Sequence, residues 1–259
     1  MEARFSRSDL GGGRADRTAL RAQRTPVEGA GLYPRPAERL RAEERDVKRW
    51  RVESEDKWLI RIGSSENETH PWSGLPLKAA EKTYATALPA IHAFQKQFRD
   101  ALIKRSDQGK YFWELRSCAY WSAFDGPKIV YPDIYEHPSY ASDESGIYLT
   151  NTCYFIPTAE KWMTALLNSS VIEWFYGNIS NRIRGGYLRS FSDYMTQIPI
   201  PPATEIEQAA LELLTHCLTE LKGEGMAPEK LAVLEEQVND RVADLFHLTP
   251  EERRLIAAG

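Results

Sequence analysis

The chain has 259 residues, of which 42% are hydrophobic and 27% charged, and its formal net charge is −4. This length and apolar content suffice for one large domain or two small ones with a real core. No apolar run approaches the roughly 18 residues of a membrane-spanning helix, and the N-terminus lacks the apolar centre of a secretory signal. We therefore expect a soluble, cytoplasmic globular protein without a membrane partner.

Cysteine and histidine spacing argues against a metal or disulfide framework. Cys118, Cys153 and Cys217 lie far apart with no Cys-x-x-Cys, and the five histidines never fall at metal-ligand spacing. A Pro-Asp…Glu-x-Lys nuclease site is disfavoured as well, because Pro132-Asp133 is followed by Glu-x-Lys only at Glu220, in a predicted helix. We predict no catalytic residue, no metal site and no disulfide in this chain.

Charge is distributed unevenly along the sequence. Carboxylates are frequent from Glu205 onward, whereas residues 178–189 carry only positive charge. Residues 1–41 contain arginine but no lysine and almost no aromatic residues, so they cannot bury enough apolar area to offset the entropy of ordering. We interpret 1–41 as a disordered or non-native tail, and we expect a one-sided basic surface on an otherwise acidic protein.

The ordered part begins with two alternating runs, Asp46–Val52 and Lys57–Ile62, which predict a β-hairpin with one face in solvent. Apolar residues then recur at three- and four-residue steps through 77–105, which predicts a helix that Pro89 either kinks or splits. The other face of this helix is basic. We favour the interpretation that this basic face is simply solvated, and contact with phosphates is the alternative. The residues of the face are Lys96, Arg99, Lys104 and Arg105.

The central stretch Gly126–Ile134 predicts a buried strand. Its residues 129–131 are β-branched or aromatic, and the prolines on either side cannot donate to a central ladder, so Lys128 is expected at the mouth of the strand. A mobile loop is predicted over Glu136–Ser145. Residues 147–156 form the longest strand candidate.

Helices are predicted for most of the remaining chain. An apolar stripe from Trp162 to Phe175 predicts a helix that ends near Gly177. Amphipathic patterns over Glu205–Lys222 and Pro228–Phe246 predict an antiparallel helical hairpin, and a last short helix begins at the Thr249 cap.

A basic glycine loop lies between these helical segments. It places Arg182, Arg184 and Arg189 around Gly185-Gly186-Tyr187, with no acidic residue before Asp193. Paired glycines let a backbone approach another molecule closely. The pattern predicts contact with a polyanion.

Seven short segments occur in an order that is known from one family. They are Arg45–Trp50, Trp58–Arg61, Tyr111–Arg116, Pro127–Ile134, Leu166–Ser169, Arg184–Tyr187 and Gln197–Pro201. Together with the closing helices from Leu234 to Glu252, this set resembles the TaqI-like C-terminal specificity domain of adenine-N6 DNA methyltransferases and fused type II restriction-modification enzymes. The resemblance covers roughly Arg45 to Ile256.

This resemblance implies sequence-specific recognition of double-stranded DNA, while in such enzymes a separate N-terminal domain binds S-adenosylmethionine and methylates a flipped adenine. The Asn-Pro-Pro-Tyr/Phe motif of that domain has no counterpart here, because Pro201-Pro202 lacks the preceding Asn and the following aromatic residue. We therefore expect no cofactor in this chain and no methylation by it alone. S-adenosylmethionine is expected only on the missing catalytic domain, and a separately encoded methyltransferase or endonuclease subunit is a further expected partner.

The predicted fold is α+β, with a mixed β-sheet target-recognition domain and packed helices over residues 42–202, followed by an antiparallel helical hairpin over 203–259.

The expected function is DNA recognition for a restriction-modification or phage-exclusion adenine-N6 methyltransferase, in which one or two arginines fork onto guanine. Two alternatives stay open: a protein-interaction module that uses the acidic C-terminal helices, and a non-functional gene fragment. Helix capping by Arg184 and protection of a strand edge by Lys128 are the corresponding structural alternatives for single residues. The candidate DNA-binding residues are Arg182, Arg184, Gly185, Gly186, Tyr187, Arg189, Lys128 and Arg116.

Overall fold

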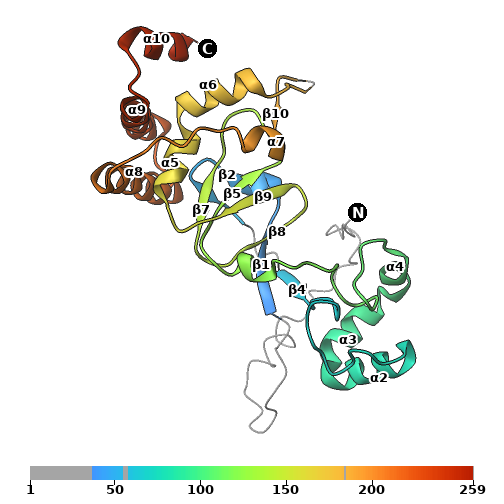
Figure 1. Cartoon of the computed structure of the whole chain (residues 1–259). Coiled ribbons are helices and arrows are strands. Elements are labelled where there is room, and N and C mark those ends of the chain that lie inside the picture. Colours follow the sequence, from blue (N-terminus) through green and yellow to red (C-terminus); the bar gives the residue numbers. More distant parts are fainter. Residues whose placement is uncertain (1–36, 55–57, 184, 259) are drawn as a thin grey trace. The chain divides into compact units, whose positions relative to one another are not determined.

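The computed structural model describes residues 37–54, 58–183 and 185–258, and it confirms a mixture of helices and strands of the α+β class (Figure 1). Most of the predicted tail lies outside these residues, but its last residues belong to strand β1 (Ala37–Ala42). The chain divides into two compact units: Ile60–Tyr120 belongs to the first, and Arg39–Leu59 joins Trp121–Gly259 in the second. The predicted domain boundary near residue 202 therefore does not coincide with a boundary between units. Within the described ranges, no helix is both long and apolar enough to cross a membrane.

The described part of the first unit contains three short helices. Strand β4 (Trp58–Arg61) leads into α2 (Leu77–Ala87), α3 (Pro89–Lys96) and α4 (Arg99–Lys104). Pro89 is the first residue of α3, where its missing N–H costs no helical hydrogen bond. The helix predicted for residues 77–105 is therefore split, not kinked.

An aromatic core holds this unit together. The rings of Tyr84 and Trp113 stack with 4.9 Å between their centroids, and Tyr111 stacks on Trp113 at the same distance. Trp72 meets both Tyr84 and Trp113 edge-on. Stacked and edge-on pairs are the favoured aromatic geometries, so the dense aromatic run of this region serves as core.

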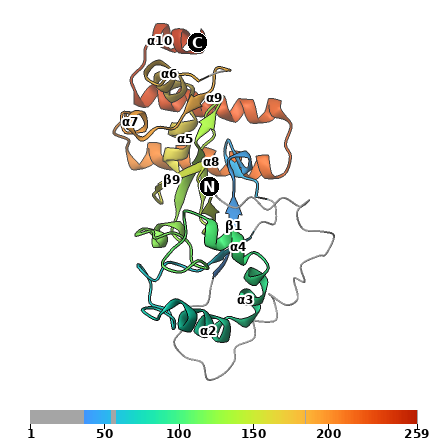
Figure 2. The same ribbon diagram turned by 90° about the vertical axis from the view of Figure 1, so that its right-hand side faces the viewer.

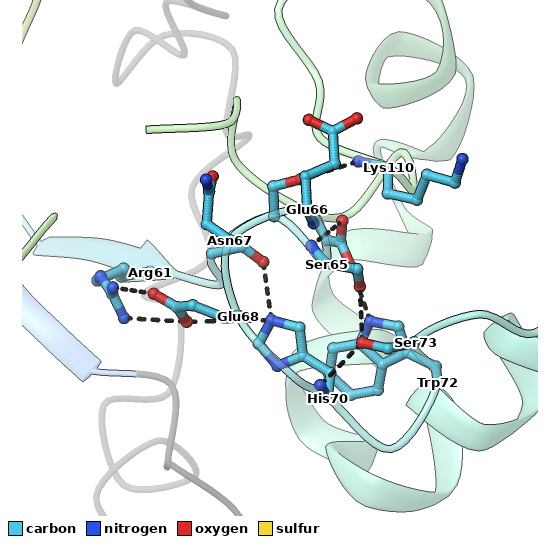
Figure 3. Close-up of polar contacts among 12 residues, drawn as sticks. Arg61, Ser65, Glu66, Asn67, Glu68, His70, Trp72, Ser73 and Lys110 are labelled. Atoms are coloured by element: carbon cyan, nitrogen blue, oxygen red, sulfur yellow. Dashed lines mark hydrogen bonds and ion pairs between the residues drawn. The ribbon is translucent and has the colours of Figure 1, made fainter. Parts of the chain in front are cut away.

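A buried carboxylate ties a loop to that core. Glu114 has no exposed surface, and its side chain accepts hydrogen bonds from the Ser65 amide at 3.0 Å and from the Trp72 indole N–H at 2.8 Å. Donors of this kind satisfy the oxygens of a buried carboxylate, while the Arg105 guanidinium donates to the backbone carbonyl of the same residue. Figure 3 shows the adjacent polar contacts of the loop, among them the ion pair between Arg61 and Glu68.

The second unit is built on a three-stranded antiparallel sheet in the order β7-β5-β9. β5 (Lys128–Pro132) is the predicted central strand, and all five of its residues are buried. Ile129 lies opposite Ser142 on β7 (Ala141–Asp143) and opposite Ile156 on β9 (Cys153–Pro157). The central position explains why β5 is almost uniformly apolar, and it places Lys128 in the interior.

The predicted hairpin between residues 46–52 and 57–62 is wrong. Instead, β2 (Val47–Lys48) pairs with β3 (Arg51–Val52) in a tighter antiparallel turn. Trp50 closes this turn at φ +75°, a conformation that costs a non-glycine residue roughly 1–2 kcal/mol. The side chain of Trp50 is fully buried in the main core, and this burial offsets the backbone cost.

Two predictions around the central sheet also need correction. The segment predicted as a mobile loop, residues 136–145, contains β7 and is therefore part of the sheet. The single strand predicted over residues 147–156 is two strands, β8 (Tyr148–Leu149) and β9. β8 pairs in parallel with β1, whereas β9 pairs antiparallel with β5, so the chain must turn between them.

Helices complete the main core of the second unit. Ser169 ends α5 (Trp162–Asn168) and caps α6 (Ser170–Ile179) through a hydrogen bond from the Ile172 amide, so the helix predicted for this region is also split. α8 (Glu205–Gly223) and α9 (Pro228–Leu245) lie side by side and form the predicted hairpin (Figure 2). The chain ends in α10 (Pro250–Ala258), which begins at the predicted Thr249 cap. The fully buried core residues of these helices include Leu166, Leu218 and Val242.

Candidate nucleic-acid interface

The arginine-glycine loop, which we define as Asn181–Tyr187, is anchored to a two-stranded sheet that follows directly after β5. It follows α6 and leads into β10 (Leu188–Arg189), which pairs antiparallel with β6 (Ile134–Tyr135) (Figure 1). The Ser190 amide donates to the Asp133 carbonyl at 2.8 Å, which extends this pairing. The loop therefore starts from a rigid base beside the end of β5.

Two glycines shape the turn of the loop. Gly185 and Gly186 have φ values of +93° and +86°, in the region that glycine adopts without strain. The Ile183 amide donates to the Tyr187 carbonyl at 2.8 Å, and the Gly186 amide donates to the Ile183 carbonyl at 3.0 Å. The turn is thus closed by its own backbone, and the side chains of Ile183 and Tyr187 are exposed.

Substitution of Gly186 by Ala should lower the free energy of unfolding by about 1–2 kcal/mol, because the left-handed backbone penalises any Cβ. Steric overlap adds nothing, since a Cβ at Gly186 meets no atom within 4 Å. Gly126→Ala is the matched control, because a Cβ there also meets nothing and its φ is not positive. Denaturant unfolding compares the two variants, and equal stability would contradict the strained geometry of the turn.

The loop exposes a cation and apolar side chains together. Arg182 is exposed, and its Nη1 donates to the Gly186 carbonyl at 2.9 Å, so the guanidinium is held over the turn. Tyr187 is 41% exposed and Ile183 37% exposed. Arg184, the other predicted cation of this loop, lies outside the described residues. An arginine beside an exposed tyrosine is a combination suited to phosphate and base contacts.

Arg189 is the most tightly positioned arginine of the site. Its Nη2 and Nε lie 2.6 and 3.3 Å from the two carboxylate oxygens of Asp133, and its guanidinium carbon lies 4.4 Å from the centroid of the Phe191 ring. The hydrogen bond to Asp133 raises the pKa of Arg189 further above its ordinary value. Nη1 has no hydrogen-bond partner in the described part of the chain. One edge of the guanidinium is therefore fixed and the other edge is available.

A second acidic group lies near this pair. Glu44, at the start of a short 3-10 turn (Glu44–Asp46), has its pKa raised, first by burial and then by repulsion from Asp133. Arg189 lowers the same pKa, so the three side chains interact electrostatically. Arg189 is thus flanked by carboxylates and adds little net positive charge to the site. It contributes a guanidinium that is held in one orientation.

Lys128 has a different environment from the one expected. Its side chain has no exposed surface, and its Nζ lies 2.6 Å from Asp143 Oδ2 and donates to the Phe124 carbonyl at 2.7 Å. β5 is flanked by a strand on each side, so Lys128 does not protect a strand edge either. We therefore leave Lys128 out of the proposed interface and assign its charge to the interior ion pair.

The predicted site residues thus fall into separate groups. Arg182, Gly185, Gly186, Tyr187 and Arg189 come together at the loop and its base. Arg116 is exposed in the first unit. Asp133, Glu44 and Phe191 were missed in the sequence. The pairing of β6 with β10, which brings Asp133 to Arg189, has no local signal, and neither has the approach of Glu44. Phe191 lies only two residues beyond Arg189 in the chain. Only the position of Asp133, directly after the central strand, could have drawn attention to it.

Comparison with known proteins identifies the family of this chain. The type II methyltransferase M.XhoI of Xanthomonas vasicola is 35% identical over 79 residues, which cover 29% of this chain and 14% of that protein. The structure of the type IIL restriction-modification enzyme MmeI in complex with DNA aligns with a TM-score of 0.44 and 12% identity, over 71% of this chain and 26% of that one, a likeness too distant to carry an argument. A family model of the TaqI-like C-terminal specificity domain matches residues 43–200, more than half of the chain. The protein therefore belongs to the TaqI-like C-terminal specificity domain family.

Proposed function

We propose that this chain is a DNA target-recognition domain that binds duplex DNA sequence-specifically for an adenine-N6 methyltransferase of a restriction-modification or phage-exclusion system. The observation that carries the proposal is the coincidence of a specificity-domain match over residues 43–200 with an exposed arginine-glycine loop on a rigid base inside that match. Specificity within a restriction-modification enzyme means choosing a short DNA site.

The loop offers two kinds of contact. Arg182 is exposed near the start of the arginine-glycine loop and suits a phosphate, which needs charge but little precision. Arg189 is held by Asp133 along its Nε–Nη2 edge, so one N–H of Nη1 and the second N–H of Nη2 can fork onto guanine O6 and N7 in the major groove. A braced arginine loses little further freedom on binding, which favours discrimination between bases.

The chemistry of methyl transfer belongs elsewhere in this proposal. A methyltransferase domain, in the same polypeptide or in a separately encoded subunit, would bind S-adenosylmethionine and act on the flipped adenine. The present chain would hold that domain at its site on DNA. The part of the curated methyltransferase to which this chain aligns is 14% of its length, as expected for one module of a larger enzyme.

Binding to duplex DNA should weaken steeply with salt, because each neutralised phosphate releases counterions. Arg182→Gln should reduce the slope of log affinity against log salt by roughly 0.9 units. Arg241→Gln removes an exposed arginine from α9 and is the matched control, expected to leave the slope unchanged. Fluorescence anisotropy with a labelled duplex measures both. Absence of duplex binding at low salt, or binding that does not respond to salt, would contradict the proposal.

A further inference from the structure

The first unit has a charge balance opposite to that of the second. Residues 60–120 contain nine basic and six acidic residues, a formal charge of +3, whereas residues 39–59 and 121–259 together contain 17 basic and 26 acidic residues, a formal charge of −9. The net charge of −4 for the whole chain conceals this difference. Positive charge is therefore concentrated in one compact unit of an acidic protein.

Internal contacts hold three of the six acidic residues between positions 60 and 120, while Glu66 and Asp100 are exposed. Glu68 pairs with Arg61, as Figure 3 shows, and Glu81 pairs with Arg99 through two hydrogen bonds of 3.0 Å. Arg99 lowers the pKa of Glu81, which keeps that carboxylate ionised and paired. Glu114 is fully buried and bound by neutral donors. These carboxylates do not neutralise the surface around them.

The cations of the unit, in contrast, are mostly left in solvent. Six of them are exposed, and their side chains have no hydrogen bond or ion pair within the described residues. Figure 3 shows Lys110 extending away from the polar network beside it. The six are Lys78, Lys82, Lys96, Lys104, Lys110 and Arg116.

Helix α2 carries its lysines where local helix energetics disfavours them. Lys78 lies in the first turn, which contains no acid, although the positive end of the helix dipole favours acids there. Lys82 follows at i+4 on the same outer face, opposite the buried Ala80 and Tyr84, and like charges at this spacing repel by a few tenths of a kcal/mol. An anion bound from solvent beside these lysines would offset both the unfavourable interaction of Lys78 with the helix dipole and the repulsion between Lys78 and Lys82.

From these observations we infer that the outer surface of α2 and α3 in the first unit is a second DNA-binding surface, which contacts backbone phosphates through Lys78, Lys82 and Lys96. This inference rests on the proposed function and extends it to α2 and α3, where solvation was the favoured interpretation of the basic face that includes Lys96. No acid in the described part of the chain holds these lysines by a hydrogen bond or an ion pair, so they present point charges that suit phosphates and not base edges. Their contribution is affinity for any duplex, whereas the arginine-glycine loop supplies discrimination.

The test compares two triple variants of the full chain that lose the same charge. Lys78→Gln/Lys82→Gln/Lys96→Gln removes the proposed contacts, and Lys222→Gln/Lys230→Gln/Arg241→Gln removes three cations from α8 and α9 of the second unit. Affinity for a labelled random-sequence duplex is measured over a range of salt concentrations. We expect the first variant to lose roughly two to three units of salt slope and about tenfold or more in affinity at about 0.1 M salt. The control should bind as the wild type does.

The outcomes separate this inference from the proposed function. If the wild type binds duplex and both triple variants keep its slope, the inference is overturned while the proposed function stands. An equal loss in both variants also overturns it, because the effect would then follow net charge and not this surface. If the wild type itself fails to bind duplex, the proposed function and the inference fall together. Circular dichroism of each variant confirms that the fold is intact.

Discussion

Lys128→Met should lower the free energy of unfolding by about 3–5 kcal/mol, the usual cost of leaving one member of a buried ion pair without its partner. Asp143 is the partner, with its oxygen 2.6 Å from Lys128 Nζ, and neither side chain is more than 8% exposed. The thioether of Met fills much of the space of the lysine stem, so the loss measures the missing charge and not a cavity. Denaturant unfolding at neutral pH gives the value.

Lys161→Met is the matched control in the same neighbourhood. Lys161 pairs with Glu144 at 2.9 Å, but these side chains are 33% and 58% exposed. An exposed pair is worth about 0–1 kcal/mol, so this variant should be close to the wild type. The double variant Lys128→Met/Asp143→Asn should recover much of the loss, since it removes the uncompensated charge. If Lys128→Met and Lys161→Met are equally stable, the buried pair does not have the role assigned to it.

The pH dependence of the same variant has a definite sign. Burial acts to raise the pKa of Asp143, but hydrogen bonds from Lys128 and Ser145 outweigh it, and the pKa lies below its ordinary value of 3.8. In the wild type, the stabilisation that ionised Asp143 contributes is therefore complete above about pH 4 and is lost as the pH falls through the lowered pKa. Without Lys128, burial should raise the pKa of Asp143. The folded Lys128→Met protein then takes up a proton more readily than its unfolded chain. The difference in the free energy of unfolding between this variant and the wild type should therefore shrink as the pH is lowered from about 7 towards 5.

Arg189→Lys should reduce the preference for the recognised site over random duplex by about 5- to 150-fold, the 1–3 kcal/mol of one bidentate arginine–guanine contact. Lysine keeps the positive charge but cannot present two parallel donors while it also pairs with Asp133. The affinity for random duplex and the salt slope should stay close to those of the wild type. Competition binding with the two duplexes gives the ratio.

The companion variant is Arg182→Lys. If Arg182 contacts a phosphate, lysine serves almost as well, and the preference for the recognised site should be retained. Loss of preference in Arg182→Lys with retention in Arg189→Lys would reverse the two assignments. Retention in both would remove Arg189 from base recognition and leave its pair with Asp133 as a purely structural contact.

Sequence predicted the elements whose signal is local. The apolar run of β5 and the Thr249 cap are each encoded by a few neighbouring residues, and the structure confirms them. Pro89 predicted either a kink or a split of the helix, and the structure has the split. The hairpin of residues 46–62 was predicted wrongly because the deciding contact is distant. The indole of Trp50 donates to Glu235 at 2.5 Å, across 185 residues, and no local pattern encodes that burial.

The candidate site likewise contains features that the sequence could predict and features that depend on distant contacts. Glycine spacing and the absence of acids predicted the arginine-glycine loop, and its positive φ angles agree with that prediction. The partner of Arg189 could not be predicted, because Asp133 reaches it through the register of β6 with β10. Lys128 was expected at the mouth of a strand because prolines bracket residues 128–131. It is the first residue of β5, but its side chain is buried and paired with Asp143, a contact that no local pattern encodes.

Selection of duplexes from a pool with a randomised central segment tests the central claim most directly, because the recognised site need not be known in advance. The full chain is incubated with the pool at moderate salt, and bound duplexes are recovered, amplified and sequenced over several rounds. A target-recognition domain should enrich one short consensus that contains at least one fixed guanine, and that guanine should lose its fixation when Arg189→Lys is used for the selection. A recovered pool as diverse as the starting one, or no recovery at all, would contradict sequence-specific DNA binding by this chain.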